Sequence, residues 1–270
     1  MNELEQNEVE KTLQKPDIHK RWESSYRTAE NERFYEEAFD YITKVLNAPK
    51  KSTFLDAGCG SCAHSIRLAK RGYFVVAIDC SESILETAEQ NIKKITLAEN
   101  IKLKTENITS LSFPDRTFDY ILCWGVLMHI PDIENGISEL DRVLKKGGYL
   151  VISEGNMFSF QSILVRNLRL FFRHKKLTVK RTIAGNETNE ITSAGKLFVR
   201  NANIRWLKDT FRSRGFNIKR HVSGQFFELY ILFSSQLLKK LIHGFNCLWF
   251  KHIKIPYFSH GNIIILQKQI

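Results

Sequence analysis

Several features are missing from this 270-residue sequence, and each absence excludes a class of protein. The chain opens Met-Asn-Glu-Leu-Glu-Gln, so it lacks the apolar N-terminal stretch of a secretory signal. No apolar run reaches the ~18 residues that a membrane-spanning helix needs. The five cysteines are an odd number without the spacing of a disulfide framework, which favours a reducing compartment. These absences predict a cytoplasmic protein.

Acidic residues are scarce in the C-terminal part of the chain. Residues 154–270 contain five aspartates and glutamates against 20 lysines and arginines, a charge of +15, whereas residues 1–153 carry a charge of −4 and the whole chain +11. Charge asymmetry of this kind favours an anionic partner for the basic part. Nucleic acid, a membrane surface and a phosphorylated substrate all meet that description.

Strand and helix patterns alternate in the first part of the chain. Short apolar runs predict strands, and apolar residues at spacings of three and four predict helices. The expected strands lie at residues 52–57, 73–78, 101–108, 118–124 and 149–153, and the helices between them at 62–71, 81–95 and 133–144. Successive strand–helix units predict a parallel sheet with right-handed crossovers, which binds ligands at the carboxyl ends of its strands.

The segments on either side follow a different pattern. Residues 1–16 are polar and are expected to lack regular structure, while residues 17–46 predict one amphipathic helix. After the core, residues 157–176 and 235–252 predict two more amphipathic helices, and residues 177–200 a polar loop. A helix at 203–214, a strand from Gly215 and a strand at 261–267 complete the chain.

A glycine-rich turn and an acidic residue stand at two neighbouring strand ends. Gly58 and Gly60 follow the first strand and open a helix, and glycines there allow a ligand to approach the backbone closely. Asp79 ends the next strand, where a carboxylate can accept both hydroxyls of a ribose. A dinucleotide site uses the same parts, but Ala63 stands where its last glycine belongs, so that alternative ranks low.

Five motifs in register strengthen this interpretation. They are Leu55-Asp56-x-Gly58-Cys59-Gly60, Ala77-Ile78-Asp79-x-Ser81, Leu111-Ser112-Phe113-Pro114-Asp115-x-Thr117-Phe118-Asp119, Val126-Leu127-Met128-His129-Ile130-Pro131-Asp132 and Arg142-Val143-Leu144-Lys145-Lys146-Gly147-Gly148. In order and spacing they resemble class I S-adenosylmethionine-dependent methyltransferases. The resemblance implies a Rossmann-like α/β fold with a seven-stranded, mostly parallel sheet in the order 3-2-1-4-5-7-6, the last strand antiparallel and helices on both faces.

The resemblance also implies which residues bind S-adenosyl-L-methionine. Gly58 and Gly60, after Asp56, would pass under the methionine and ribose, and Asp79 would hold the ribose hydroxyls. The other residues that it places around the cofactor are Cys80, Asn107 and Ile108 at the adenine and Cys123 and Trp124 at the methionine end. Two positions depart from the family pattern: Cys62 replaces the third glycine of the turn, and Asn107 replaces the usual aspartate but still offers an acceptor.

The sequence gives fewer signals for catalysis. Methyl transfer needs an aligned acceptor and, for a hydroxyl, removal of a proton. His129, just past the fourth strand, is the candidate base, although a histidine that ties its loop to the backbone is at least as consistent with the pattern. Tyr26 and Arg27 precede the sheet in a segment that covers the cofactor in this family, so they are substrate-side candidates.

No metal site is expected, because cysteines at these strand ends suit small apolar positions better than a ligand set. The two basic amphipathic helices are interpreted either as caps on the core or as a lid over a bulky anionic acceptor, with their apolar sides suited to a bilayer interface. The domain plan is therefore an N-terminal tail and lid helix (1–48), a cofactor-binding core (49–156) and a substrate-side C-terminal part with basic insertions (157–270).

These observations lead to a functional hypothesis. The protein is expected to methylate an oxygen of a small-molecule or saccharide acceptor, one that is lipid- or phosphate-linked, and to reach the inner face of the membrane as a peripheral protein. One alternative is an RNA- or protein-directed methyltransferase, although basic residues interleaved with apolar ones argue against nucleic acid. Another is a non-catalytic S-adenosylmethionine-binding protein. The oligomeric state and the identity of the acceptor stay open.

Overall fold

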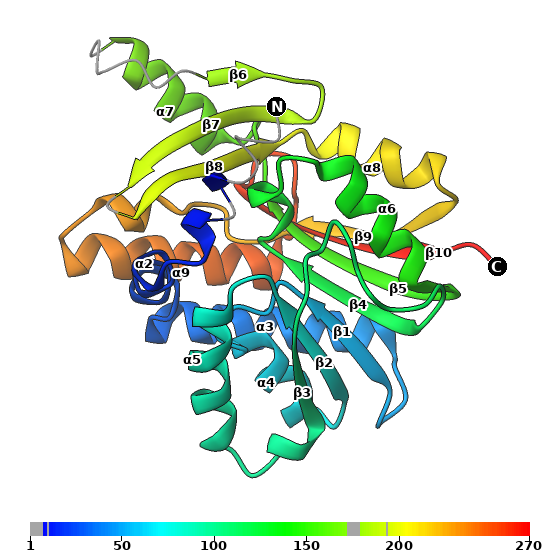
Figure 1. Cartoon of the computed structure of the whole chain (residues 1–270). Helices are drawn as coiled ribbons and strands as arrows, with labels where there is room; N and C mark the ends of the chain where they lie inside the picture. The colour runs from blue at the N-terminus through cyan, green and yellow to red at the C-terminus, as the bar shows by residue number, and fades with distance from the viewer. Residues whose placement is uncertain (1–7, 10, 172–178, 193) are drawn as a thin grey trace.

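A seven-stranded sheet forms the centre of the protein in the computed structural model, which describes residues 8–9, 11–171, 179–192 and 194–270 (Figure 1). Its strands are β1 (Thr53–Ala57), β2 (Phe74–Asp79), β3 (Ile101–Thr105), β4 (Phe118–Trp124), β5 (Leu144–Gly155), β9 (Phe216–Ser223) and β10 (Gly261–Lys268). The order is β3-β2-β1-β4-β5-β10-β9, and β10 is antiparallel to both of its neighbours. Since β9 and β10 are the sixth and seventh strands of this sheet, the order is the predicted 3-2-1-4-5-7-6.

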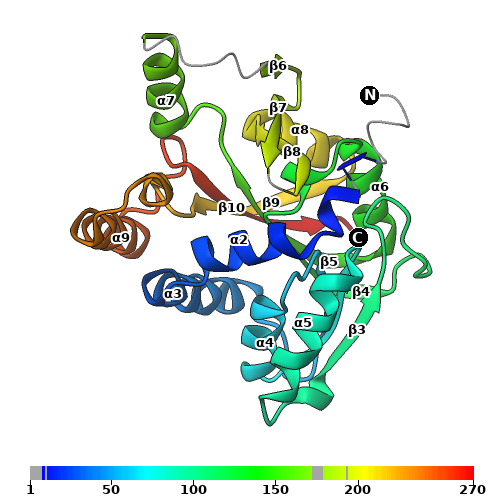
Figure 2. The ribbon, with the colours of Figure 1, turned by 60° about the vertical axis from the view of Figure 1, so that its left-hand side comes forward.

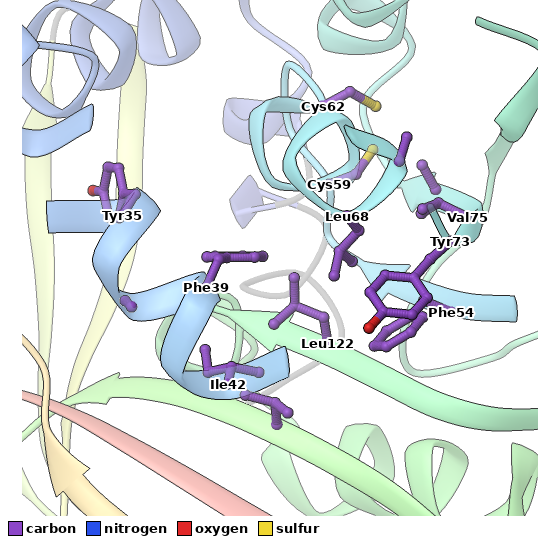
Figure 3. Packing of buried hydrophobic residues seen from close by; sticks show 14 of the residues in the cluster. Tyr35, Phe39, Ile42, Phe54, Cys59, Cys62, Leu68, Tyr73, Val75 and Leu122 are labelled. Atoms are coloured by element: carbon purple, nitrogen blue, oxygen red, sulfur yellow. The ribbon is translucent and has the colours of Figure 1, made fainter. Parts of the chain in front are cut away.

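Helices bury both faces of the sheet. The helices α3 (Ala29–Leu46), α4 (Ala63–Lys70) and α5 (Glu82–Lys93) contribute to one apolar cluster, and α6 (Ile133–Val143) and α8 (Ile204–Ser213) to a second. Figure 3 shows the first cluster, in which Phe39 and Ile42 lie near Leu122 of β4. The central strands β1, β4 and β10 carry near-continuous apolar runs because both of their faces are buried, whereas the edge strands β3 and β9 are partly exposed.

The N-terminal segment is more ordered than the sequence predicts. Val9 and Leu13 are buried against Leu197 and Phe198, so the expectation that residues 1–16 lack regular structure is wrong for the described positions. The helix predicted at 17–46 is two helices, α2 (Pro16–Tyr26) and α3. The break has a local cause, because the Thr28 side chain accepts a hydrogen bond from the backbone of Asn31 and begins a new helix.

The loop predicted at 177–200 is also wrong. Three antiparallel strands, β6 (Val179–Arg181), β7 (Gly185–Thr192) and β8 (Gly195–Ala202), form a second sheet there. Only β8 buries apolar side chains, among them Leu197 and Phe198, whereas β7 is largely polar. A polar strand that is held by backbone pairing to its neighbours leaves little trace in the hydropathy pattern.

The two predicted amphipathic helices are present, as α7 (Phe160–Phe171) and α9 (Gln236–His252). The last residues of the first predicted helix, Arg173 and Lys176 among them, lie outside the described residues. Three short 3-10 helices, η1 (Ala98–Asn100), η2 (Leu127–His129) and η3 (Leu229–Leu232), complete the described chain. No described helix combines the length and the apolar character needed to cross a membrane.

Candidate functional site at the carboxyl edge of the sheet

The glycine turn after β1 is fastened to the end of β2. The backbone N–H groups of Gly58 and Cys59 both donate to the carbonyl of Ile78, at 2.8 Å each. Gly58, Gly60 and Cys62 all have positive φ angles, of 83°, 52° and 64°. A Cβ on Gly58 would lie 2.4 Å from the Val126 side chain, whereas a Cβ on Gly60 would meet nothing within 4 Å. The turn therefore has open space above Gly60.

Asp79 lies beside this open space. One carboxylate oxygen accepts the Gly60 backbone N–H at 2.9 Å and the other accepts the Ser81 N–H at 3.0 Å. Burial raises the pKa of Asp79, and the hydrogen bonds from the backbone of Ser81 and Gly60 oppose that shift. The turn and the carboxylate thus meet at the same edge of the sheet, as the sequence predicts. Each carboxylate oxygen keeps a second lone pair for a ribose hydroxyl.

A hollow of about 280 Å³ opens at the ends of β2 and β3. Its lining residues are Gln14, Cys80, Thr105, Glu106 and Asn107. The volume is close to the lower limit of ligand sites. Cys80 and Asn107, two of the predicted adenine-side residues, therefore border one space, although the Asn107 side-chain oxygen also accepts two hydrogen bonds from Thr109, at 2.9 and 3.0 Å.

Three other predicted cofactor residues are buried beneath the edge. Asp56 accepts a hydrogen bond from the Ser65 hydroxyl at 2.5 Å, and burial raises the pKa of Asp56 to about 7. Ile108 and Cys123 belong to the apolar cluster on the α6 side of the sheet. These three side chains therefore pack inside the sheet layers and support the strand ends without facing the open space.

Trp124, at the end of β4, lies among aromatic rings. Its ring centre is 5.1 Å from that of His64, 5.6 Å from that of Phe39 and 6.0 Å from that of Tyr35. These rings come from β4, α3 and α4, so they connect the strand end with the helices that precede and follow β1. They form an apolar wall at the predicted methionine end.

His129 lies on η2, and one of its ring nitrogens is engaged in a hydrogen bond to the backbone. Its Nδ1–H donates to the Phe198 carbonyl at 2.9 Å, which leaves Nε2 as the nitrogen that can accept a proton. Burial lowers the pKa of His129, so the ring is neutral near pH 7. The Trp22 ring lies 4.9 Å from it. The histidine thus ties its loop to β8, as one reading of the sequence has it, and is in a protonation state suited to a base.

The loop that carries His129 is held by two buried ionisable side chains that sequence reasoning missed. Glu154, at the end of β5, accepts the Leu127 N–H at 2.9 Å, and Arg200 on β8 donates to the carbonyls of Ile130 and Pro131 at 2.7 and 3.0 Å. Burial raises the pKa of Glu154 to about 8. The only sequence signal was that Glu154 is one of the few acids of the basic half and follows an apolar strand.

The N-terminal segment crosses this edge of the sheet, as Figure 2 shows for α2. The Gln14 amide donates to the Cys80 carbonyl at 2.6 Å, and the His19 ring lies 3.0 Å from the Ser81 hydroxyl. Ser81 precedes α5, and its side chain bonds His19 and Ser83 and makes no capping bond. The polar composition of the segment gave no signal of this cover, which only the family resemblance implied as a lid.

The substrate-side candidates Tyr26 and Arg27 lie on different sides of the lid. Arg27 lines a second hollow of about 290 Å³ with Glu23, Ser61, Ile66 and Asn91 and forms an ion pair with Glu32 at 2.8 Å. Tyr26 faces Glu228, whose charge is the largest cause of the raised pKa of Tyr26. The structure therefore does not bring the two neighbours together.

Glu228 and His260 form a further polar cluster that the sequence did not reveal. A carboxylate oxygen of Glu228 lies 3.6 Å from Nε2 of His260. His260 lies at the end of β5, because a Cβ on Gly155 would come within 3.4 Å of its ring. Burial raises the pKa values of Tyr35 and Tyr230, and the charge of Glu228 adds to both shifts. Since Tyr35 contacts Trp124, this cluster continues from the predicted methionine end.

No three histidine, cysteine, aspartate or glutamate side chains within the described ranges are grouped so that they could hold a metal ion.

Comparison with known proteins identifies the core. Residues 55–152 match the family model described as a methyltransferase domain. The demethylmenaquinone methyltransferase of Geobacillus sp. (strain WCH70) is 36% identical over 114 residues, 41% of this chain and 48% of that protein. The protein of the same name from Bacillus licheniformis is 33% identical over 140 residues, 50% of this chain and 57% of that protein. The match thus spans about half the length of these curated relatives.

Solved structures share the fold over nearly the whole chain. Magnesium protoporphyrin IX methyltransferase from Synechocystis PCC 6803, solved with bound SAH, has a TM-score of 0.64 at 15% identity and covers 96% of this chain and 98% of its own. A SAM-dependent methyltransferase from Methanosarcina mazei has a TM-score of 0.60 at 22% identity, covering 85% and 97%. At these identities the comparison shows the fold.

Proposed function

We propose that the protein is a class I S-adenosylmethionine-dependent methyltransferase that transfers the methyl group to a hydroxyl oxygen of a small-molecule or saccharide acceptor; the match of residues 55–152 to a methyltransferase domain supports this. The observation that carries this proposal is the meeting of the open glycine turn with Asp79, 2.9 Å from the backbone N–H of Gly60. The names of the curated relatives support a small-molecule acceptor.

We assign the cofactor residues from this geometry. Asp79 accepts the ribose hydroxyls, the backbone at Gly58 and Gly60 passes under the sugar and the methionine, and Cys80 and Asn107 border the adenine. The cofactor supplies a methyl group already activated on a sulfonium. Asp56, Ile108 and Cys123 fix the strand ends, and Trp124 shields the methionine end from water.

The acceptor would lie beyond Trp124, over the ends of β4 and β5. Two candidate bases face that region. Neutral His129 offers Nε2 on one side, and Glu228 beside His260 offers a carboxylate on the other. We favour Glu228 as the group that touches the acceptor hydroxyl, because it lies 3.6 Å from His260, which borders the end of β5, whereas His129 lies against Trp22 and is tied to the Phe198 carbonyl.

The acceptor that fits best is lipid- or phosphate-linked. Residues 155–270 contain four acidic residues, Glu187, Glu190, Asp209 and Glu228. The remainder of this half is basic and apolar, so it suits an anionic group next to a hydrophobic one. Such an acceptor would be met at the inner face of the membrane by a cytoplasmic protein.

Calorimetry with S-adenosylmethionine, followed by an acceptor screen that scores release of S-adenosylhomocysteine, tests the proposal. Binding and turnover on a hydroxyl acceptor are expected, with the product's methylated atom assigned by NMR. Glu228→Gln should lower turnover at least tenfold at unchanged cofactor affinity, because a carboxamide cannot take the proton. The matched control is Glu86→Gln, on the exposed side of α5. Cofactor binding without turnover on any acceptor would support a non-catalytic role, and turnover on RNA or protein alone would contradict the acceptor class.

A further inference from the structure

Helix α9 is oriented with its polar side inward. Its buried side chains are His243, Asn246 and Phe250, of which Asn246 is only 1% exposed. On the opposite side Leu237, Leu241 and Leu248 are 70%, 61% and 61% exposed. A helix that covers a core normally buries its apolar stripe. The arrangement is therefore the reverse of that expected for a cap on the sheet.

Specific contacts fix this orientation. The Asn246 side-chain oxygen accepts the Phe227 N–H at 2.9 Å, and its amide donates to the Phe227 carbonyl at 2.8 Å. The His243 ring lies 4.2 Å from the ring of Tyr230. Rotating α9 to bury its leucines would break both hydrogen bonds and leave two buried backbone groups unpaired, which is costly. The leucines thus remain outside.

The exposed apolar surface continues beyond α9. The segment after the helix exposes Tyr257 and Phe258, and the backbone N–H of Phe160, at the start of α7, donates to the carbonyl of Phe258 at 3.1 Å. Figure 2 shows α7 and α9 on the same side of the molecule. We call this surface the α9 face; its exposed apolar residues are Phe158, Phe160, Leu164, Ile231, Phe233, Leu237, Leu238, Leu241, Phe245, Leu248, Ile253, Ile255, Tyr257 and Phe258.

The segment that forms most of this face is basic. Residues 229–270 contain no aspartate or glutamate. Lys240 and Lys251 are exposed on α9, and Arg166 lies on α7. A second copy docked through the same face would oppose these cations to one another. A nucleic acid would pair with the cations but would leave the leucines in water.

We propose that the α9 face docks the protein on an anionic lipid bilayer. The leucines and aromatic side chains enter the boundary between headgroups and acyl chains, and the lysines pair with anionic headgroups, which is the arrangement of interfacial amphipathic helices. Large contiguous apolar patches on a protein surface mark interaction sites. Docking does not depend on methyl transfer, and it would bring a lipid-linked acceptor to the edge that Glu228 borders.

Flotation of the full chain with vesicles tests the proposal, without cofactor or acceptor. Vesicles of phosphatidylcholine and phosphatidylglycerol at a 7:3 ratio should carry the protein, and pure phosphatidylcholine vesicles should carry at least tenfold less. Leu241→Asp/Leu248→Asp should lower binding to the mixed vesicles at least tenfold. The matched control is Ile183→Asp/Ile191→Asp, which adds the same charge at residues 72% and 92% exposed on the second sheet and should bind like the parent.

A second pair of variants tests the charges. Lys240→Glu/Lys251→Glu should remove the preference for anionic vesicles, whereas Lys94→Glu/Lys102→Glu, on exposed positions of the core, should keep it. The proposal is overturned if the parent protein does not float with mixed vesicles, or if both leucine and isoleucine variants lose binding equally. It is also overturned if the parent protein is a dimer without vesicle binding and the leucine variant is a monomer. Calorimetry with S-adenosylmethionine on the same samples reports separately on the methyltransferase proposal.

Discussion

Replacing Asp79 by alanine addresses the pocket most directly. The change removes the carboxylate that accepts the Gly60 and Ser81 N–H groups and, in our assignment, the two ribose hydroxyls. Hydrogen bonds to a charged acceptor are worth about 1.5–3 kcal/mol, and water can replace part of the loss, so we expect cofactor affinity to fall by about 1–3 kcal/mol. That corresponds to a factor of roughly 5–150 in Kd.

Isothermal titration calorimetry with S-adenosylhomocysteine measures this loss without interference from turnover. Ser81→Ala is the local control, because it removes a hydroxyl that bonds His19 and Ser83 while it keeps the backbone N–H that Asp79 accepts. The control should bind within about twofold of the parent. An Asp79→Ala protein that is folded by circular dichroism and binds with parental affinity would refute the assignment of this carboxylate to the ribose.

Three further predictions follow from the same edge of the sheet. His129→Ala should reduce turnover and leave cofactor affinity within about twofold; full activity would remove it as a base. Burial raises the pKa of Glu154 from an ordinary 4.5 to about 8, so the folded protein keeps a proton that the unfolded chain loses, and stability falls as pH rises through that range. Glu154→Gln should flatten this part of a urea-denaturation series, and an unchanged slope would contradict the shift. Gly58→Ala should lower Tm more than Gly60→Ala. Both substitutions cost about 1–2 kcal/mol for a left-handed backbone, but only the Cβ at position 58 would clash with a side chain, that of Val126 at 2.4 Å. Gly60→Ala should instead weaken cofactor binding, and equal effects of the two variants on Tm and on affinity would contradict the open space above Gly60.

The sequence by itself determined the core. Apolar strands that alternate with helical patterns predict a parallel sheet, since both faces of the sheet must be covered and crossovers are right-handed. The position of Gly58, Gly60 and Asp79 at one edge follows from that, whereas the order of the seven strands was implied by the resemblance to class I methyltransferases. The positions of Cys80, Asn107 and Trp124 at strand ends could be predicted for the same reason. The positions of these residues follow from short stretches of sequence and from the repeated alternation of strand and helix.

Only the tertiary structure decided what faces that edge. Glu154, Arg200, Glu228 and His260 come together from segments far apart in the chain, and no local pattern encodes such a contact. The polar strand β7 was missed because its stability comes from pairing with neighbours and not from its own composition. For α9 the hydropathy pattern showed an amphipathic helix but not which side is buried, because two hydrogen bonds from Asn246 to distant backbone decide that orientation.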